Sequence, residues 1–76
     1  MADDQEQPLR AFGERIRKRR LRLGISQEAL ADLSGLHPQT VGRIERGQSN
    51  VTLMNVVVLA DVLDVDPGTL TRKLKP

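Results

Sequence analysis

Apolar residues along the chain recur every three or four positions, which is the spacing of one face of an α-helix. The first apolar stripe follows Pro8, a residue that suits the first turn of a helix, and stops at Gly24. Its members are Leu9, Phe12, Ile16 and Leu23. Nowhere do apolar and polar residues alternate as they do in a half-buried strand, so the pattern predicts an all-α fold.

Capping residues divide the rest of the chain into four further short helices. Ser26, Thr52 and Asp66 are favoured N-cap residues, and Pro38 and Pro67 suit a first helical position. The five predicted helices are joined by connections of a few residues each. The residues of the second helix that are expected to face inward are Leu30, Ala31 and Leu33.

The third predicted helix, residues 38–46, has a narrow apolar face. It lies in the stretch HPQTVGRIERG and carries only two core-facing apolar residues, Val41 and Ile44. On a helical wheel at about 100° per residue, Gln39, Arg43 and Arg46 share one stripe almost opposite the core. Arginine and glutamine can read base edges in the major groove of DNA, although an ordinary exposed helix would show the same stripe.

The charge of the chain is unevenly distributed. Residues 10–46 carry nine basic and four acidic side chains, whereas the remaining residues carry three basic and six acidic ones. A basic half of this kind is typical of a protein that binds a polyanion, and a solvated helix face is the alternative. A basic amphipathic helix can also bind a membrane surface, but here the apolar stripe is needed for the core.

Length and composition exclude several classes of protein. The 76 residues allow one domain, which we expect over residues 8–74, after a disordered acidic tail over residues 1–7. With no cysteine and a single histidine, the sequence predicts no disulfide, no metal site and no cofactor. No apolar run approaches the length of a membrane span or of a secretion signal, so we expect a cytoplasmic protein without a membrane partner.

The second and third predicted helices together describe a helix-turn-helix. They are joined by the short turn LSGLHP, in which Gly35 can adopt a left-handed conformation. From Phe12 to about Leu70 the sequence resembles the Cro/C1-type helix-turn-helix repressors of bacteria and phages. The residues that carry the resemblance are Gln27, Ala31, Gly35, Val41, Ile44 and the ending IERG of the third helix.

The resemblance implies DNA-contacting roles for residues of the first three helices. Gln39 and Arg43 match positions that read base edges, and Thr40 is a second candidate for such a contact. Phosphate contacts are implied for Gln27, Arg46, Arg17 and His37.

The resemblance also implies an ion pair between Arg20 and Glu45 that joins the first helix to the third. The sequence departs from the family pattern at His37 and Pro38, where a Ser or Thr cap and a polar base contact are usual. Pro38 suits the first helical position but cannot donate a hydrogen bond to a base. A further departure is Arg19, at a position that is often apolar in the family. A charged residue at this position is expected to reduce the number of apolar side chains in the core.

The fourth predicted helix is apolar on two sides. The residues expected to face the core are Leu53, Val56, Val57, Leu59, Ala60 and Leu63. An exposed second stripe marks an interface in many proteins, although the tail or the fifth helix could cover it here. In the family, the surface around the fourth and fifth helices forms the homodimer contact. The predicted interface therefore consists of Met54, Val58, Val62, Val65, Leu70 and Leu74.

Taken together, the residues and the resemblance predict a sequence-specific, DNA-binding transcriptional regulator of bacterial type, a repressor or autoregulator. It would bind double-stranded DNA as a homodimer, with residues 38–46 in the major groove of a pseudo-palindromic operator. The alternative is a helix-turn-helix antitoxin whose main partner is another protein. An enzyme is not expected, because no paired carboxylates, nucleophile-base set or phosphate loop can be placed in one cleft.

Overall fold

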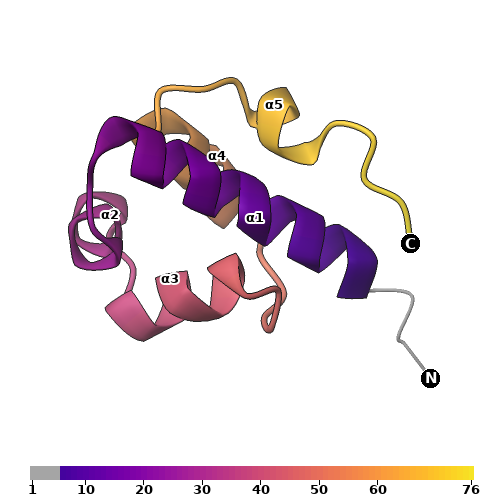
Figure 1. Cartoon of the computed structure of the whole chain (residues 1–76), viewed down its shortest axis with the longest axis horizontal. Helices are drawn as coiled ribbons and strands as arrows, with labels where there is room; N and C mark the ends of the chain where they lie inside the picture. Colours follow the sequence, from indigo (N-terminus) through magenta and orange to yellow (C-terminus); the bar gives the residue numbers. More distant parts are fainter. Residues whose placement is uncertain (1–5) are drawn as a thin grey trace.

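Five helices make up the described part of the chain, residues 6–76 of a computed structural model (Figure 1). They are α1 (Glu6–Leu23), α2 (Gln27–Ser34), α3 (Pro38–Glu45), α4 (Leu53–Val62) and α5 (Pro67–Thr71). In Figure 1 α1 runs diagonally across the molecule, with α3 below it and α5 above it. Residues 6–76 contain no strand, so the predicted all-α fold is confirmed.

α1 begins two residues earlier than the position of Pro8 indicated. Glu6 and Gln7, which the sequence pattern assigned to a disordered tail, are helical, and the rest of that predicted tail lies outside the described residues. The negative charge of Glu6 lies in the first turn, where it interacts favourably with the helix dipole. Pro8 still falls within this first turn, where its missing N–H has no helical partner.

The predicted N-cap residues are present. The hydroxyl of Ser26 accepts a hydrogen bond from the backbone N–H of Ala29 at 2.9 Å, and that of Thr52 accepts one from Asn55 at 3.0 Å. Asp66 caps α5 in the same way. Each oxygen satisfies a backbone N–H that the first turn of a helix leaves without an internal partner. Helices as short as α2 are marginal on their own, so their ends depend on such caps.

The turn between α2 and α3 is closed by two backbone hydrogen bonds. The N–H of Leu36 donates to the carbonyl oxygen of Ala31 at 2.8 Å, and that of Gly35 donates to Asp32 at 3.3 Å. This pairing satisfies carbonyl groups at the end of α2. It also fixes the angle at which α3 leaves α2, which is the geometry of a helix-turn-helix.

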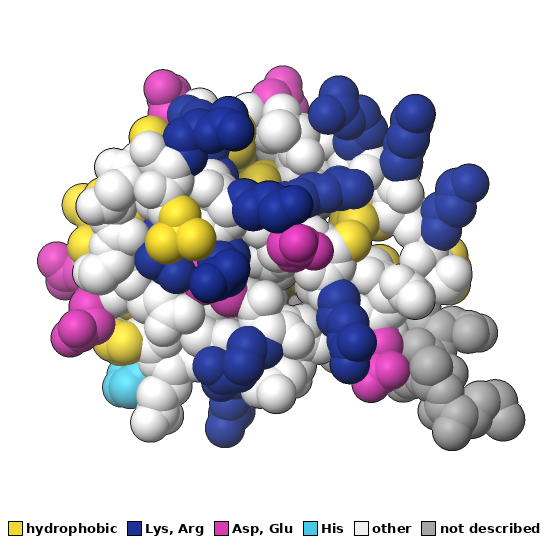
Figure 2. All heavy atoms as spheres, viewed as in Figure 1, with side chains coloured by type: hydrophobic (Ala, Val, Ile, Leu, Met, Phe, Trp, Pro, Cys, Tyr) yellow, Lys and Arg dark blue, Asp and Glu magenta, His cyan; other side chains and the backbone are white. Residues whose placement is uncertain are grey.

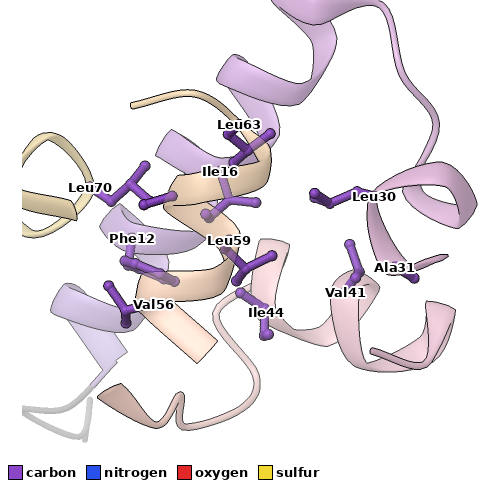
Figure 3. Packing of buried hydrophobic residues seen from close by; sticks show 11 residues of the cluster. Phe12, Ile16, Leu30, Ala31, Val41, Ile44, Val56, Leu59, Leu63 and Leu70 are labelled. Atoms are coloured by element: carbon purple, nitrogen blue, oxygen red, sulfur yellow. The ribbon is translucent and has the colours of Figure 1, made fainter. Parts of the chain in front are cut away.

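One hydrophobic core lies between the five helices (Figure 3). Ile16 of α1, Leu30 of α2, Ile44 of α3 and Leu59 of α4 contribute to it, and none is more than 2% exposed. Leu70 of α5 closes the core and is 1% exposed. Burial of a large aliphatic side chain is worth about 1.5–3 kcal/mol, so these few residues hold α3 in place from behind.

Four apolar residues that the pattern placed toward the core are exposed instead. Leu53 is 77% exposed, Leu33 is 63% exposed, and Val57 and Leu23 are each 41% exposed. Leu23 and Leu33 lie in the last turns of their helices, beyond the edge of the core. In α4, eight of the ten residues are apolar, so the pattern does not fix the orientation of this helix about its axis. The packing orients it so that the buried stripe is Val56, Leu59, Ala60 and Leu63.

Two glycines allow α1 to lie directly against the carboxyl-terminal end of α3. A Cβ atom at Gly13 would overlap the carbonyl oxygen of Ile44 and lie 2.7 Å from that of Glu45. Gly47 has a φ angle of 70°, and a Cβ atom there would lie 2.8 Å from the Cα atom of Arg10. The backbones of the two helices are therefore in contact at this point.

A buried ion pair joins α1 and α3. Arg20 Nε donates to Glu45 Oε2 at 2.6 Å and Arg20 Nη2 donates to Glu45 Oε1 at 3.0 Å. The two residues are 8% and 7% exposed. Hydrogen bonding to the Glu45 carboxylate raises the pKa of Arg20 above its ordinary value, although desolvation acts in the opposite direction. Because a two-point contact between planar groups fixes their orientation as well as their distance, the pair sets the position of α3 on α1.

Replacement of Glu45 by glutamine removes the negative partner of a buried arginine. We expect Glu45→Gln to lower the free energy of unfolding by about 3 kcal/mol, because Arg20 is left buried without an opposite charge. Glu14→Gln is the matched control, since Glu14 pairs with Lys18 at 3.3 Å on the surface and such pairs are worth about 0–1 kcal/mol. Urea denaturation followed by circular dichroism measures both losses. Equal losses would contradict the role given to the buried pair.

Alanine substitutions at two helical glycines should act in opposite directions. We expect Gly13→Ala to lower the free energy of unfolding by at least about 2 kcal/mol, because its methyl group would push α1 off the backbone of α3. Gly42→Ala is the comparison, since its Cβ would meet only the Arg46 side chain, at 3.2 Å. That variant should gain up to about 1 kcal/mol of helix propensity. Thermal denaturation checks both, and a Gly13→Ala variant as stable as the parent would exclude the close contact.

Candidate nucleic-acid interface

α3 begins at a histidine cap followed by a proline. The Nδ1 atom of His37 accepts a hydrogen bond from the backbone N–H of Gln39 at 3.3 Å, and Pro38 occupies the first turn, where its missing N–H costs nothing. His37 thus takes a role that serine or threonine more often takes. Val41 and Ile44 are 1% and 2% exposed, and they attach α3 to the core by one narrow face.

Four polar side chains lie together on the side of α3 away from the core. Gln39, Arg43 and Arg46 are exposed, and with the half-buried Gln27 of α2 they line one shallow hollow of about 480 Å³. We call these four residues the recognition surface. Gln39 and Arg43 of α3 and Arg46, the residue that caps its carboxyl-terminal end, are those that the helical wheel placed on one stripe.

The guanidinium of Arg46 is held in place by its neighbours. Arg46 Nε donates to Gln48 Oε1 at 3.0 Å, and the Arg46 side chain passes over Gly42, which has no side chain to displace it. Gln48 was not among the residues predicted from the sequence. Its contact depends on the turn after α3 rather than on a helical repeat, so no pattern in the sequence points to it.

Gln27 connects the recognition surface to the buried ion pair. Its Nε2 atom donates to Glu45 Oε1 at 2.9 Å, which is the same oxygen that accepts a hydrogen bond from Arg20. α1, α2 and α3 therefore share one hydrogen-bonded group. Thr40 is half-buried at the edge of α3, so it is less accessible than Gln39 or Arg43.

The phosphate-contact candidate on α1 is not part of this group. Arg17 is exposed, but it does not line the hollow of the recognition surface. Arg10, which the sequence analysis did not single out, lines a second polar hollow together with Arg46 and Gln48. This grouping depends on the close packing of α1 against the end of α3, which no local sequence signal reports.

Four of the six predicted dimer residues are buried in the protein's own core or packed against it. Leu70 is 1% exposed, so the prediction that its side chain contributes to a dimer contact is wrong. α5 folds back against α1 and α4 and buries this side chain between them. Val62, Val65 and Leu74 are partly buried and pack against the same core, which leaves only part of each side chain accessible.

An exposed apolar patch remains on the first turns of α4. Met54 is 64% exposed and Val58 is half-buried, and these two were predicted to face a partner. Leu53 and Val57, which the pattern had placed in the core, lie beside them with 77% and 41% exposure. We call these four residues the α4 patch. An accessible apolar cluster of this kind is typical of an interface.

The chemistry of the recognition surface is that of hydrogen-bond donors and acceptors on an exposed short helix. Guanidinium and amide groups of this kind bind base edges and phosphates in the major groove. Among residues 6–76, no three His, Cys, Asp or Glu side chains come together in a way that could hold a metal ion. Within the same residues, no helix is both long and apolar enough to cross a membrane.

The chain is similar to known proteins in both sequence and structure. Residues 16–70 match the family model described as Helix-turn-helix. Control protein C.SmaI of Serratia marcescens is 43% identical over 63 residues, which cover 82% of this chain and 75% of that protein. The restriction-modification controller protein C.AhdI from Aeromonas hydrophila is 52% identical in sequence. Its crystal structure matches this chain with a TM-score of 0.80, over 82% of this chain and 94% of the C.AhdI chain. The P22 c2 repressor in complex with synthetic operator 9T is 33% identical, with a TM-score of 0.76 over 80% and 92% of the two chains. The chain therefore belongs to the Cro/C1-type helix-turn-helix family of DNA-binding transcriptional regulators.

Proposed function

We propose that the chain binds a two-fold symmetric operator as a homodimer and regulates transcription from it. The observation that carries this proposal is the recognition surface, whose four side chains surround one hollow on α3 and α2. α3 is held from behind by the core and by the Arg20–Glu45 pair, so the surface meets DNA as a preorganised element. The similarity to a repressor solved on a synthetic operator supports the same conclusion.

Gln39 and Arg43 are the proposed base-reading residues. Arginine can donate two hydrogen bonds to guanine, and glutamine can exchange two with adenine. Thr40 adds a hydroxyl and a methyl group at the edge of the same contact. Because Pro38 brings no hydrogen-bonding group to the first turn, the specificity depends on few side chains and on the shape of the DNA.

The proposed phosphate contacts surround the base-reading residues. Arg46 and Gln27 line the same hollow as the base-reading residues, and His37 lies at the amino-terminal end of α3, where backbone N–H groups also favour an anion. Arg17 would reach the backbone from α1. Contacts of this kind fix the position of α3 on the duplex but carry no sequence information directly.

The α4 patch is the proposed dimer contact. Met54 and Leu53 are its most exposed members. A two-fold dimer would place two copies of α3 about 34 Å apart, one turn of DNA, and would read two half-sites. Because two chains must assemble on each bound operator, operator occupancy would depend steeply on the protein concentration.

The similarity to controller and repressor proteins gives no support to the alternative of an antitoxin. The relative from Aeromonas hydrophila is a restriction-modification controller, which favours restriction-modification genes as the genes that this chain regulates.

In vitro selection of random DNA by the purified chain tests the proposal. We expect a motif with two inverted half-sites about 10 base pairs apart, and recovery of unrelated sequences without symmetry would contradict it.

Arg43→Ala should remove one base preference. On the selected site we expect a loss of about 1–3 kcal/mol in binding free energy, together with tolerance of any base at one position in each half-site. Arg43→Lys is the matched control, because it keeps the charge but loses the two-point contact, so it should relax the same position. Binding titrations on single-base variants of the site measure this. An equal loss of binding free energy on every sequence would indicate that Arg43 contacts a phosphate and not a base.

Arg46→Ala should weaken binding to all sequences alike. We expect the slope of log K against log salt concentration to fall by about one unit for each Arg46 that binds a phosphate. The control is Arg22→Ala, which also removes one positive charge, but from the side of α1 that faces away from α3. The slope for this variant should stay close to that of the parent. Fluorescence titrations at several salt concentrations measure the slope for both variants. An unchanged slope for Arg46→Ala would exclude a contact between Arg46 and a phosphate.

Met54→Asp should dissociate the dimer. In a two-fold dimer each chain contributes its own residue 54, so the substitution removes two apolar side chains from the interface and buries two charges there. We therefore expect dimerisation to weaken at least about 10-fold. Leu21→Asp is the matched control, because Leu21 is 51% exposed on α1, outside the α4 patch. Sedimentation equilibrium measures both variants. A Met54→Asp protein that remains fully dimeric would place the interface elsewhere.

A further inference from the structure

A second basic surface lies on the side of α1 that faces α5, away from α3. Figure 1 shows α3 and α5 on opposite sides of α1, and Figure 2 shows Lys and Arg side chains gathered over α1 and α5 in the same view. A groove of about 350 Å³ lies between these two helices, and we call it the α1–α5 groove. The six basic residues that line it are Arg15, Lys18, Arg19, Arg22, Arg72 and Lys73.

Two of these arginines are held in place by backbone carbonyl groups. Arg15 Nη1 donates to the carbonyl oxygens of Leu70 at 3.1 Å and of Arg72 at 2.8 Å. Arg19 Nε donates to the carbonyl oxygen of Leu63 at 2.8 Å, so this departure from the family pattern binds the end of α4 and does not open the core. A guanidinium has five N–H donors, and both residues keep donors that these contacts leave free. The arginines therefore present fixed positive groups to the groove.

Within residues 6–76, few carboxylates balance the charge of the groove. No acidic side chain is among the lining residues in the described part of the chain. Of the six basic side chains, Lys18 alone pairs with a described carboxylate, that of Glu14, at 3.3 Å on the surface. Positive charges this close repel one another, so an anion in the groove would stabilise the protein. A duplex bound to α3 lies on the other side of α1 and cannot supply that anion.

The shape of the groove favours a peptide over nucleic acid. A space of about 350 Å³ between two helices admits a few side chains, whereas a duplex presents a wide convex backbone. Single strands bind on exposed aromatic side chains, and the one aromatic residue of the chain, Phe12, is 2% exposed in the core. Val65 and the aliphatic stems of the arginines supply apolar contacts between the charges.

We propose that the α1–α5 groove binds an acidic peptide segment of another protein, with carboxylates on the arginines and lysines and an aliphatic side chain near Val65. This inference goes beyond the proposed function, because the groove and the recognition surface lie on opposite sides of α1. A partner held in the groove would leave α3 free, so the regulator could carry that partner to its operator.

Titration of the isotope-labelled chain with a synthetic peptide tests the proposal. The probe is ELEELE with blocked ends, which carries four carboxylates and two leucines, and the readout is the backbone amide spectrum. We expect saturable shifts of the signals of Thr69, Leu70 and Arg72, with little change at Gln39 and Arg43. The absence of saturable shifts at millimolar peptide would overturn the proposal.

A pair of double variants separates a specific groove from general attraction to a basic protein. Lys18→Gln with Arg72→Gln removes two charges from the groove and leaves the carbonyl contacts of Arg15 and Arg19 intact. Arg10→Gln with Arg17→Gln removes the same charge from outside the groove. We expect the first pair to weaken peptide binding by about 10-fold and the second by less than about 3-fold, because exposed charges beyond about 8 Å are screened. Equal weakening would overturn the proposal.

Two further probes distinguish an acidic peptide from other anionic ligands of the groove. Citrate at the same carboxylate concentration should shift the groove signals only weakly, since it has no aliphatic side chain to place near Val65. A duplex of 20 base pairs should shift the signals of α3 more than those of Thr69 and Leu70. Citrate shifts equal to those of the peptide, or duplex shifts centred on the groove, would each overturn the proposal in favour of a small anion or a nucleic acid.

Discussion

The contact between α1 and the end of α3 sets the position of the recognition surface. Arg20, Glu45 and Gln27 form one hydrogen-bonded group that joins three helices, next to the point where Gly13 meets the backbone of α3. A domain of this size buries a small core, so apolar packing alone leaves the position of an eight-residue helix weakly specified. The buried pair supplies the missing orientation, and the recognition surface takes its rigidity from it.

The features that the residues alone predict are those with local causes, whereas the long-range Arg20–Glu45 pair was expected only from the family resemblance. The caps at Ser26 and Thr52 bind backbone groups three residues away, and the stripe of Gln39 and Arg43 follows from the helical repeat. The features that could not be predicted depend on distant segments. The carbonyl contacts of Arg15 reach 55 and 57 residues along the chain, and the orientation of α4 was ambiguous because apolar residues surround most of the helix. The wrong assignment of Leu70 has the same origin, because only the folded α5 shows that its side chain is buried.

The basic residues that the sequence concentrates in its first half serve two different surfaces. Arg43 and Arg46 lie on the recognition surface, whereas four residues of α1 line the α1–α5 groove. Because successive residues of a helix point in different directions, one basic helix can contribute to both. The net charge therefore does not indicate a single partner. It reflects the recognition surface and a second basic face on the other side of α1.

Methylation interference on the selected operator shows whether α3 enters the major groove. Methyl groups on guanine N7 lie in the major groove, where α3 is placed by this account. The prediction is strong interference at guanines in two clusters about 10 base pairs apart, with one guanine in each cluster becoming insensitive in Arg43→Ala. Binding that tolerates N7 methylation throughout the site would show that α3 does not enter the major groove, whatever the affinity for DNA.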